Sequence, residues 1–395
     1  MVSEKMVELG TNRSVIRELF EYGNKRKAEI GADKVYDFSL GNPSVPAPDC
    51  VKKAALEVLN EMDPVALHGY TSAPGDAGLR KAIADYTNEK HGTQLTADNI
   101  YITVGAAASL TIAVNALAEE QDEFITFAPF FPEYRVFVEQ TGSKLVVVAC
   151  RKEDFQIDTE AFEQAITEHT KGVILNSPNN PSGVVITEEG IQTVCAILEK
   201  KQKEYGHPIF LIADEPYREL VYGDVFVPYL MNYYDNTIVC YSYSKSLSLP
   251  GERIGYIAVS EKAVQWQTVY AAVCGAGRAL GYVCAPSMFQ QVIKRCIGAT
   301  SDVSKYKENR DILYQALTDY GYRCIKPDGA FYLFVESLEK DANAFSEKAK
   351  ALDLLLVPAD SFGTPGFVRI SYCVSKEQIE NSLPAFKKLA ESYGK

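Results

Sequence analysis

The stretch SYSKSLSLPGERIGY, from Ser242 to Tyr256, decides how the rest of the chain is arranged. It overlaps the apolar, β-branched and aromatic run TIVCYSY, which predicts a buried strand that begins at residue 237. Lys245 therefore lies where a core strand ends, which is where open α/β sheets keep their ligand sites. Residues 254–260 predict another strand after a loop too short for a helical crossover, so the two strands should pair antiparallel.

The same stretch offers an amine beside donors for a phosphate. A lysine at the end of a core strand is partly desolvated, which lowers its pKa and makes the amine a usable nucleophile. Arg253 and the hydroxyls of Ser242, Ser244 and Ser246 are donors suited to a phosphate. This combination favours pyridoxal phosphate held by Lys245 as a Schiff base. A surface lysine in a serine-rich turn is the alternative.

Composition indicates a globular chain with an acidic balance. Its 395 residues, 47% of them hydrophobic, allow two domains and a sizeable core. The net charge of −12 argues against a nucleic-acid partner. The charged start lacks the apolar segment of a signal peptide and no apolar run has the length of a membrane span, so we expect a cytoplasmic protein without membrane contact. Nine singly scattered cysteines and four histidines without ligand spacing predict reduced thiols and no metal site.

Between residues 76 and 260, helical patterns alternate with short apolar strands. Strands that are continuously apolar and separated by helices predict an α/β fold with a largely parallel sheet covered on both faces. The expected strands are 100–104, 123–129, 144–150, 171–178, 208–215, 237–244 and 254–260, and the expected helices are 76–91, 107–118, 132–141, 158–168 and 187–205.

The two ends of the chain predict a second, smaller α+β unit. Before the core come a helix over 13–30, a strand over 35–40, a Pro/Gly-rich loop over 41–48, a helix over 49–61 and an irregular segment over 62–76. After residue 285 come a long helical stretch over 286–320, strands at 331–337, 353–358 and 367–374, and helices at 342–352 and 376–392. We expect residues 1–45 to form an N-terminal arm and part of the small domain, 46–285 the large domain, and 286–395 the rest of the small domain.

Four further patterns could carry chemistry. Asp214 ends the strand IFLIADE, where it could pair with a protonated pyridine nitrogen or cap a helix. Asn180 in SPNNPSG could donate to a phenolate or a carboxylate, or belong to an ordinary tight turn. The small residues of VGAAASL (104–110) let backbone N–H groups approach a phosphate, or only permit close packing. Arg369 in the strand FVRISY needs an anion, either a substrate carboxylate or an internal salt-bridge partner.

The order of these motifs resembles that of the class I/II aminotransferases, which are fold-type I enzymes of the aspartate aminotransferase superfamily and depend on pyridoxal phosphate. The matching motifs are Gly-Asn-Pro at 41–43, Tyr70, small residues after a strand, NNPSG, DEPY, SYSK, an arginine eight residues after the lysine, and FVRIS. They span residues 38–373, essentially the whole chain. The resemblance implies a mostly parallel seven-stranded sheet sandwiched by helices, with a smaller α+β domain built from both termini.

The resemblance also implies roles for the matching residues. Lys245 would form the Schiff base and move the proton between substrate Cα and cofactor C4′, and Asp214 would pair with the pyridine nitrogen. Arg369 and the backbone of Gly41 would bind the substrate α-carboxylate, with Asn180 beside them. The other cofactor contacts would come from Tyr217 and Asn180 at the ring hydroxyl, Phe131 at the ring face, and Ala106, Ala107, Ser242, Ser244, Arg253 and a neighbouring subunit's Tyr70 at the phosphate.

The resemblance implies that the protein is an amino-acid:2-oxoacid aminotransferase that works by a ping-pong mechanism. It also implies that the protein is a homodimer. A C–S β-lyase would use the same Lys245 and Asp214, so the motifs leave that alternative open. A non-catalytic regulator that binds pyridoxal phosphate is a third reading, disfavoured because every catalytic position is filled. An acidic, aspartate-type substrate would need a second cation. Arg278 is a candidate by its distance from Lys245 along the chain, and a surface role is the alternative.

Overall fold

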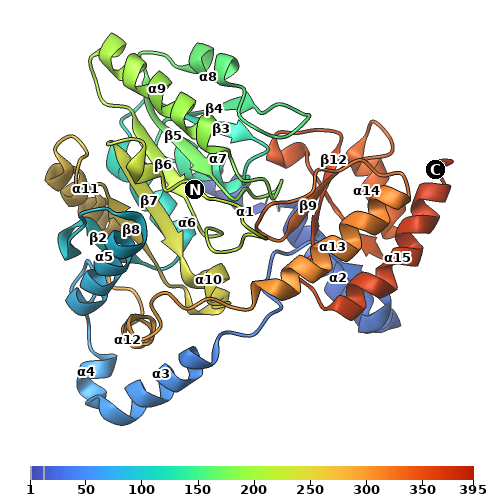
Figure 1. The fold of residues 1–395 in the computed structure, drawn as a ribbon, viewed down its shortest axis with the longest axis horizontal. Coiled ribbons are helices and arrows are strands. Elements are labelled where there is room, and N and C mark those ends of the chain that lie inside the picture. The colour runs from blue at the N-terminus through green and yellow to red at the C-terminus, as the bar shows by residue number, and fades with distance from the viewer. Residues whose placement is uncertain (1, 12–13) are drawn as a thin grey trace.

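A seven-stranded sheet forms the centre of the larger unit in the computed structural model, which describes residues 2–11 and 14–395 (Figure 1). The strand order is β2-β8-β7-β6-β5-β3-β4, and all neighbours are parallel except β8, which is antiparallel to both β2 and β7. The strands are β2 (Ile100–Thr103), β3 (Glu123–Ala128), β4 (Lys144–Ala149), β5 (Thr170–Asn176), β6 (Phe210–Asp214), β7 (Thr237–Ser242) and β8 (Gly255–Val259). The predicted α/β fold, the largely parallel sheet and the antiparallel β7–β8 pair are confirmed.

Helices cover both faces of this sheet, which explains why its strands are apolar throughout. In β6, Leu211 and Ala213 belong to one core, and the intervening Phe210 and Ile212 belong to the other. The first core includes side chains of α5 (Ala77–His91), α8 (Thr159–Ala165) and α9 (Glu188–Tyr205), and the second includes side chains of α6 (Ala106–Leu117), α7 (Glu133–Glu139) and α11 (Trp266–Ala279). The alternation of side chains along each strand thus supplies two separate cores.

The smaller unit combines the two ends of the chain. Its sheet has the order β11-β12-β9, with both pairs antiparallel, and β1 pairs parallel with β10. Its elements are α2 (Val15–Ile30), β1 (Tyr36–Asp37), α13 (Val303–Asp319), β9 (Tyr332–Glu336), α14 (Ala342–Lys350), β10 (Leu354–Leu355), β11 (Val357–Pro358), β12 (Phe367–Ser371) and α15 (Lys376–Glu391). The predicted α+β unit from both termini is therefore confirmed. The first residue of the helix expected over 13–30 lies outside the described residues.

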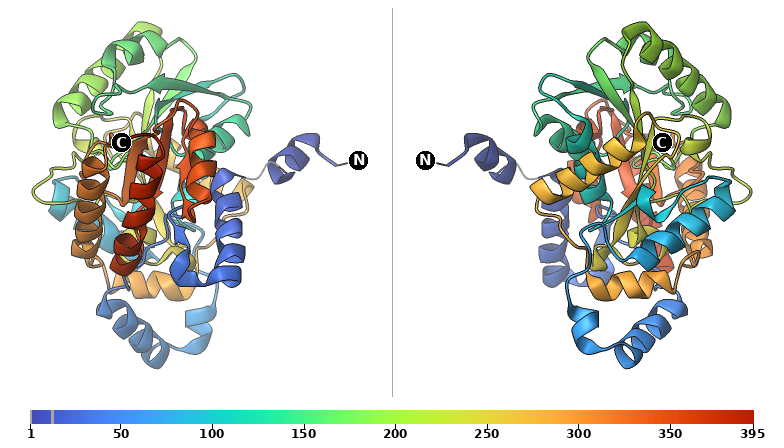
Figure 2. Two further views of the ribbon diagram at one scale, coloured as in Figure 1. Left: turned by 90° about the vertical axis from the view of Figure 1, so that its right-hand side faces the viewer. Right: turned by 90° about the vertical axis from the view of Figure 1, so that its left-hand side faces the viewer.

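Three stretches add detail to the prediction. The long helical stretch expected over 286–320 contains two helices, α12 (Ser287–Lys294) and α13, because Asp302 caps a new helix and accepts from the backbone N–H of Ser304. The irregular segment over 62–76 contains a short helix, α4 (Pro64–His68), which begins at the capping side chain of Asp63 and a first-turn proline. At the N-terminus, α1 (Glu4–Thr11) projects from the body of the molecule and buries none of its residues (Figure 2).

The helix α12 packs against α3 (Asp49–Glu61), α4 and α5, so it contributes to the core of the larger unit although it follows residue 285. The domain limits at residues 45 and 285 stay a prediction. In the described ranges 2–11 and 14–395, no helix combines the length and the apolar character needed to cross a membrane.

Candidate active site

The carboxyl ends of three parallel strands bring the candidate residues to one edge of the sheet. Asp214 is the last residue of β6, Asn180 follows β5, and Lys245 follows β7. Arg369 arrives from β12 of the smaller unit, and one of its guanidinium nitrogens donates to the side-chain oxygen of Asn180 at 3.1 Å. The other donates to the carbonyl of Ser39 at 2.6 Å. The site therefore lies where the two units meet.

Lys245 lies in the short helix α10 (Tyr243–Ser246), which begins directly after β7 with Ser242 as its cap. The lysine is half-buried, and its Nζ donates to the carbonyl of Gly41 at 2.6 Å. Burial is the main cause that lowers the pKa of Lys245 to about 8, and the positive charges of Arg369 and Arg253 lower it further. The amine is thus held inside the site, which does not fit the alternative of a surface turn.

Asp214 is buried, with 5% of its surface exposed. One carboxylate oxygen accepts a 2.5 Å hydrogen bond from the hydroxyl of Tyr134, and the other has no hydrogen-bond partner among the described residues. Burial raises the pKa of Asp214 to about 7, against the opposing effect of the Tyr134 hydrogen bond. No helix begins directly after β6, where residues 216–219 form turns, so the helix-cap alternative fails. The free oxygen fits a cationic ring nitrogen.

Arg369 is the second buried charge of the site, only 2% exposed. No carboxylate pairs with it in the part of the chain that the structure describes, and its Nε is buried without a partner. Its guanidinium lies 4.8 Å from the ring centre of Tyr332 and 5.1 Å from that of Phe362. Burial lowers the pKa of Arg369. A buried guanidinium with a free N–H and no carboxylate partner suits a carboxylate that arrives with a substrate.

The expected phosphate donors also converge. Gly105 precedes α6 with φ = 96°, no side chain caps this helix, and Ala106 and Ala107 are its first residues. A Cβ on Gly105 would lie 2.6 Å from Nη2 of Arg253, so the guanidinium lies over the start of α6. The hydroxyls of Ser242 and Ser244 are 2.7 Å apart, and Nη1 of Arg253 approaches the hydroxyl of Ser244 at 3.5 Å. Uncapped amides, a cation and hydroxyls together fit an anion such as phosphate.

Three side chains of this region were missed by the sequence analysis. Asn176 donates to the carbonyl of Asp214 at 2.8 Å and accepts from the backbone N–H of Asn180 at 2.7 Å, which ties the Asn180 loop to β6. The hydroxyl of Tyr332 is 2.9 Å from that of Tyr217. Tyr134, the third missed residue, follows the half-buried Phe131 by three positions, and their rings meet edge to face at 5.8 Å. Because Asp214 is 80 residues away from Tyr134 in the sequence, no local signal marks Tyr134.

Two expected residues are not brought to this cluster. Tyr70 is fully exposed, and Arg278 is exposed on α11. Within residues 2–11 and 14–395, no hydrogen bond or ion pair links either side chain to the other candidates. Tyr70 and Arg278 would contribute to such a site only if a second molecule placed its own site against them.

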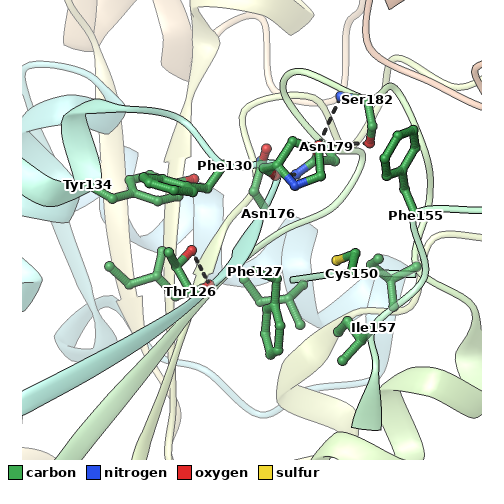
Figure 3. Close-up of a pocket in the computed structure, with 14 residues that line it drawn as sticks. Thr126, Phe127, Phe130, Tyr134, Cys150, Phe155, Ile157, Asn176, Asn179 and Ser182 are labelled. Atoms are coloured by element: carbon green, nitrogen blue, oxygen red, sulfur yellow. Dashed lines mark hydrogen bonds between the residues drawn. The ribbon is translucent and has the colours of Figure 1, made fainter. Parts of the chain in front are cut away.

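A small cavity of about 20 Å³ lies beside the site (Figure 3). Tyr134 and Asn176, which both contact Asp214, line it together with Phe130, Cys150 and Asn179. This volume admits about one water molecule and is too small for an amino acid. The cavity is therefore packing space behind Asp214 and not a substrate pocket.

The fold and the site combine a parallel α/β sheet with a lysine amine, a helix start that no side chain caps and a buried arginine near one sheet edge. The chain belongs to the family described as aminotransferase class I and II, whose model matches residues 33–386. It is 29% identical over 392 residues to an aspartate aminotransferase of Pyrococcus horikoshii, a match that covers 96% of this chain and 95% of that protein.

Solved structures agree with this membership. An amino transferase from Eubacterium rectale is 60% identical with a TM-score of 0.98, and both chains are covered completely. An aspartate aminotransferase from Thermotoga maritima is 28% identical with a TM-score of 0.86, with 98% of this chain and 99% of that chain covered. The predicted family and the prediction of an aminotransferase are confirmed.

Proposed function

We propose that this aminotransferase transfers amino groups between amino acids and 2-oxoacids with pyridoxal phosphate bound at Lys245. The observation that carries the proposal is the Lys245 amine, with a pKa of about 8, which feels the charges of both Arg253 at the uncapped start of α6 and Arg369, a guanidinium without a carboxylate partner. When bound, pyridoxal phosphate supplies an aldehyde that condenses with amines and a ring that accepts electrons.

The residues present fit this cofactor. The unpartnered oxygen of Asp214 would hold the proton of the ring nitrogen, Tyr217 and Asn180 would donate to the ring hydroxyl, and Phe131 would lie on the ring face. The phosphate would be held by Ala106, Ala107, Ser242, Ser244 and Arg253, with Tyr70 of the partner subunit.

Lys245 would act first as the tether and then as the proton carrier. The amine becomes neutral as the pH rises through about 8, and the carbonyl of Gly41 holds its Nζ in place. Once a substrate amine has displaced it, the Lys245 amine would take the proton from the substrate Cα and deliver it at the cofactor C4′. Arg369, with the backbone of Gly41, would fix the α-carboxylate and so orient the Cα–H bond.

An aspartate-type substrate is supported by the names of the relatives from Pyrococcus horikoshii and Thermotoga maritima. A side-chain carboxylate needs a cation besides Arg369, and Arg278 is exposed on α11 and available to a second subunit. A homodimer is further supported by the full exposure of Tyr70. A cytoplasmic location stays a prediction.

The direct test compares Lys245→Ala with Lys262→Ala, a change at an exposed lysine. We expect Lys245→Ala to lose the absorption band of the lysine-linked cofactor and to slow the half-reaction roughly 10³-fold or more, because both tether and proton carrier are lost. Lys262→Ala should behave as wild type. Transamination by Lys245→Ala at a near wild-type rate would refute the assignment.

The same half-reaction, run across amino acids, identifies the substrate. Aspartate and glutamate are expected to convert the bound cofactor in this half-reaction. If neither amino acid does so, the proposal of an acidic substrate is discarded. Pyruvate and ammonia released from a cysteine conjugate without an oxoacid would instead identify a C–S lyase.

A further inference from the structure

Tyr332 lies at the meeting point of three parts of the proposed site. It begins β9, is 2% exposed, and packs in the core of the smaller unit. Its ring meets that of Tyr217 edge to face, with the centroids 5.7 Å apart. A tyrosine buried to this extent keeps its ring and its hydroxyl in one position, so its contacts define its role.

The hydroxyl of Tyr332 has one hydrogen-bond partner among the described residues, the hydroxyl of Tyr217 at 2.9 Å. A phenol has a single proton to donate. If Tyr217 is to direct its proton at a cofactor, Tyr332 must be the donor within the pair. Burial raises the pKa of Tyr332 to about 12, so this hydroxyl keeps its proton at neutral pH.

The ring of Tyr332 lies under the guanidinium of Arg369, 4.8 Å from ring centre to carbon. This contact follows from the sheet, because Arg369 pairs with Phe334 across the β9–β12 ladder and Tyr332 is two residues before Phe334 on the same face. An aromatic face at this distance stabilises a desolvated cation. The ring thus supports the group proposed to hold the substrate carboxylate.

The third contact is with Gly41. A Cβ on Gly41 would collide with the hydroxyl of Tyr332, so a glycine is needed for the two segments to approach. The carbonyl of the same Gly41 accepts from Nζ of Lys245. One side chain therefore touches the cofactor-facing tyrosine, the substrate-facing arginine and the residue that holds the lysine.

We infer that Tyr332 is a positioning residue that couples the grip on the substrate carboxylate to the orientation of the Tyr217 hydroxyl. This inference rests on the proposed function. The ring and the hydroxyl have separable tasks: the ring supports Arg369, and the hydroxyl fixes the direction in which Tyr217 donates.

The test separates these tasks with two variants of the holoenzyme. Tyr332→Phe keeps the ring and removes the hydroxyl, so KM for the amino acid should stay within about twofold while kcat falls roughly 3- to 10-fold, the size of one neutral hydrogen bond. Tyr332→Leu also removes the ring, and KM should rise roughly 3- to 30-fold because a cation–π contact is lost.

Two readouts do not depend on turnover. The pH at which the visible absorption of the bound cofactor changes should be higher in Tyr332→Phe than in wild type. Weaker donation from Tyr217 would leave more negative charge on the oxygen of the cofactor ring. That charge would hold the proton on the nitrogen shared by Lys245 and the cofactor more tightly. The dissociation constant of pyridoxal phosphate from this variant should rise several-fold.

Tyr372→Phe is the matched control. Tyr372 is a buried tyrosine of the same unit whose hydroxyl donates to that of Tyr222 at 3.2 Å, so its loss also breaks a tyrosine pair. It should leave the spectrum, kcat and KM unchanged. Wild-type values in Tyr332→Phe, or equal changes in Tyr372→Phe, would overturn the inference. If Tyr332→Leu does not fold, Tyr332→Phe decides alone. A failure of the proposed function itself would show in the wild-type protein, as absent visible absorption and no half-reaction.

Discussion

At the scale of single residues, the candidate site contains charged groups with buried atoms that have no partner of opposite charge or no hydrogen-bond donor among the described residues. Arg369 has no carboxylate beside it, and one oxygen of Asp214 has no donor, in the described part of the chain. Burying such groups without partners is unfavourable. They are consistent with ligands that complete them, a substrate carboxylate at Arg369 and a cationic ring nitrogen at Asp214.

Asp214 should make the stability of the cofactor-free enzyme depend on pH. Its pKa of about 7 in the native state lies above its ordinary value of 3.8, so the native state binds more protons than the unfolded state between these limits. The free energy of unfolding should therefore fall as the pH rises from 4 to 7, by up to about 4 kcal/mol. Urea unfolding across this range checks the slope.

The variant Asp214→Asn tests the same point because it removes the titrating group. Its stability relative to wild type should increase as the pH rises from 4 to 7. Asp224→Asn, a change at an exposed carboxylate, should reproduce the wild-type curve. A constant difference between wild type and Asp214→Asn at all pH values would contradict the prediction.

Sequence reasoning located some of these positions and missed others for a physical reason. Asp214, Asn180 and Lys245 follow apolar strands, and a parallel sheet collects the ends of such strands at one edge. Tyr134 and Tyr332 contact Asp214 and Tyr217 from 80 and 115 residues away. Only tertiary packing creates those contacts, so no local pattern marks them.

At the scale of elements, the start of α6, which no side chain caps, is the proposed phosphate site. Gly105→Ala should weaken it, because φ = 96° disfavours alanine and the new Cβ would displace Arg253. We expect pyridoxal phosphate to bind roughly 10-fold more weakly, the loss of a charged hydrogen bond, and inorganic phosphate to compete less well. Titration of the cofactor-free enzyme measures both.

Gly92→Ala is the control for the backbone cost of that change. Gly92 follows α5 with φ = 72°, and a Cβ there would meet nothing within 4 Å. It should lower stability by about 1 kcal/mol and leave cofactor affinity unchanged. Equal affinities for Gly105→Ala and wild type would show that α6 does not bind the phosphate.

The sequence located the strands to within one or two residues in most cases, because continuous apolar runs mark both ends. The helical stretch predicted over 286–320 did not separate α12 from α13, although Gly298 interrupts the helical pattern between them. The capping signal of Asp302 was the feature that should have separated them.

At the scale of the whole molecule, the site draws on both units and is proposed to draw on a second copy. Mixing Lys245→Ala with Tyr70→Ala protein tests the second copy. Dimers of either variant alone should have weak cofactor binding or low activity. A mixed dimer, however, has one intact site, with Lys245 from one subunit and Tyr70 from its partner. After random exchange, about a quarter of wild-type activity should return. Activity that stays at the sum of the separate variants would argue against a shared site.

The position of β8 has a consequence for how the protein is made. Thr103 at the end of β2 pairs with Gly255 of β8, about 150 residues later, and Gly255 also lies between Gly105 and Ser242. During synthesis, β2 has no sheet neighbour until β8 leaves the ribosome, roughly 8 to 30 s later at 5–20 residues per second. The proposed phosphate site is thus completed only after β8 has been made, and a chain that stops before residue 255 cannot build it.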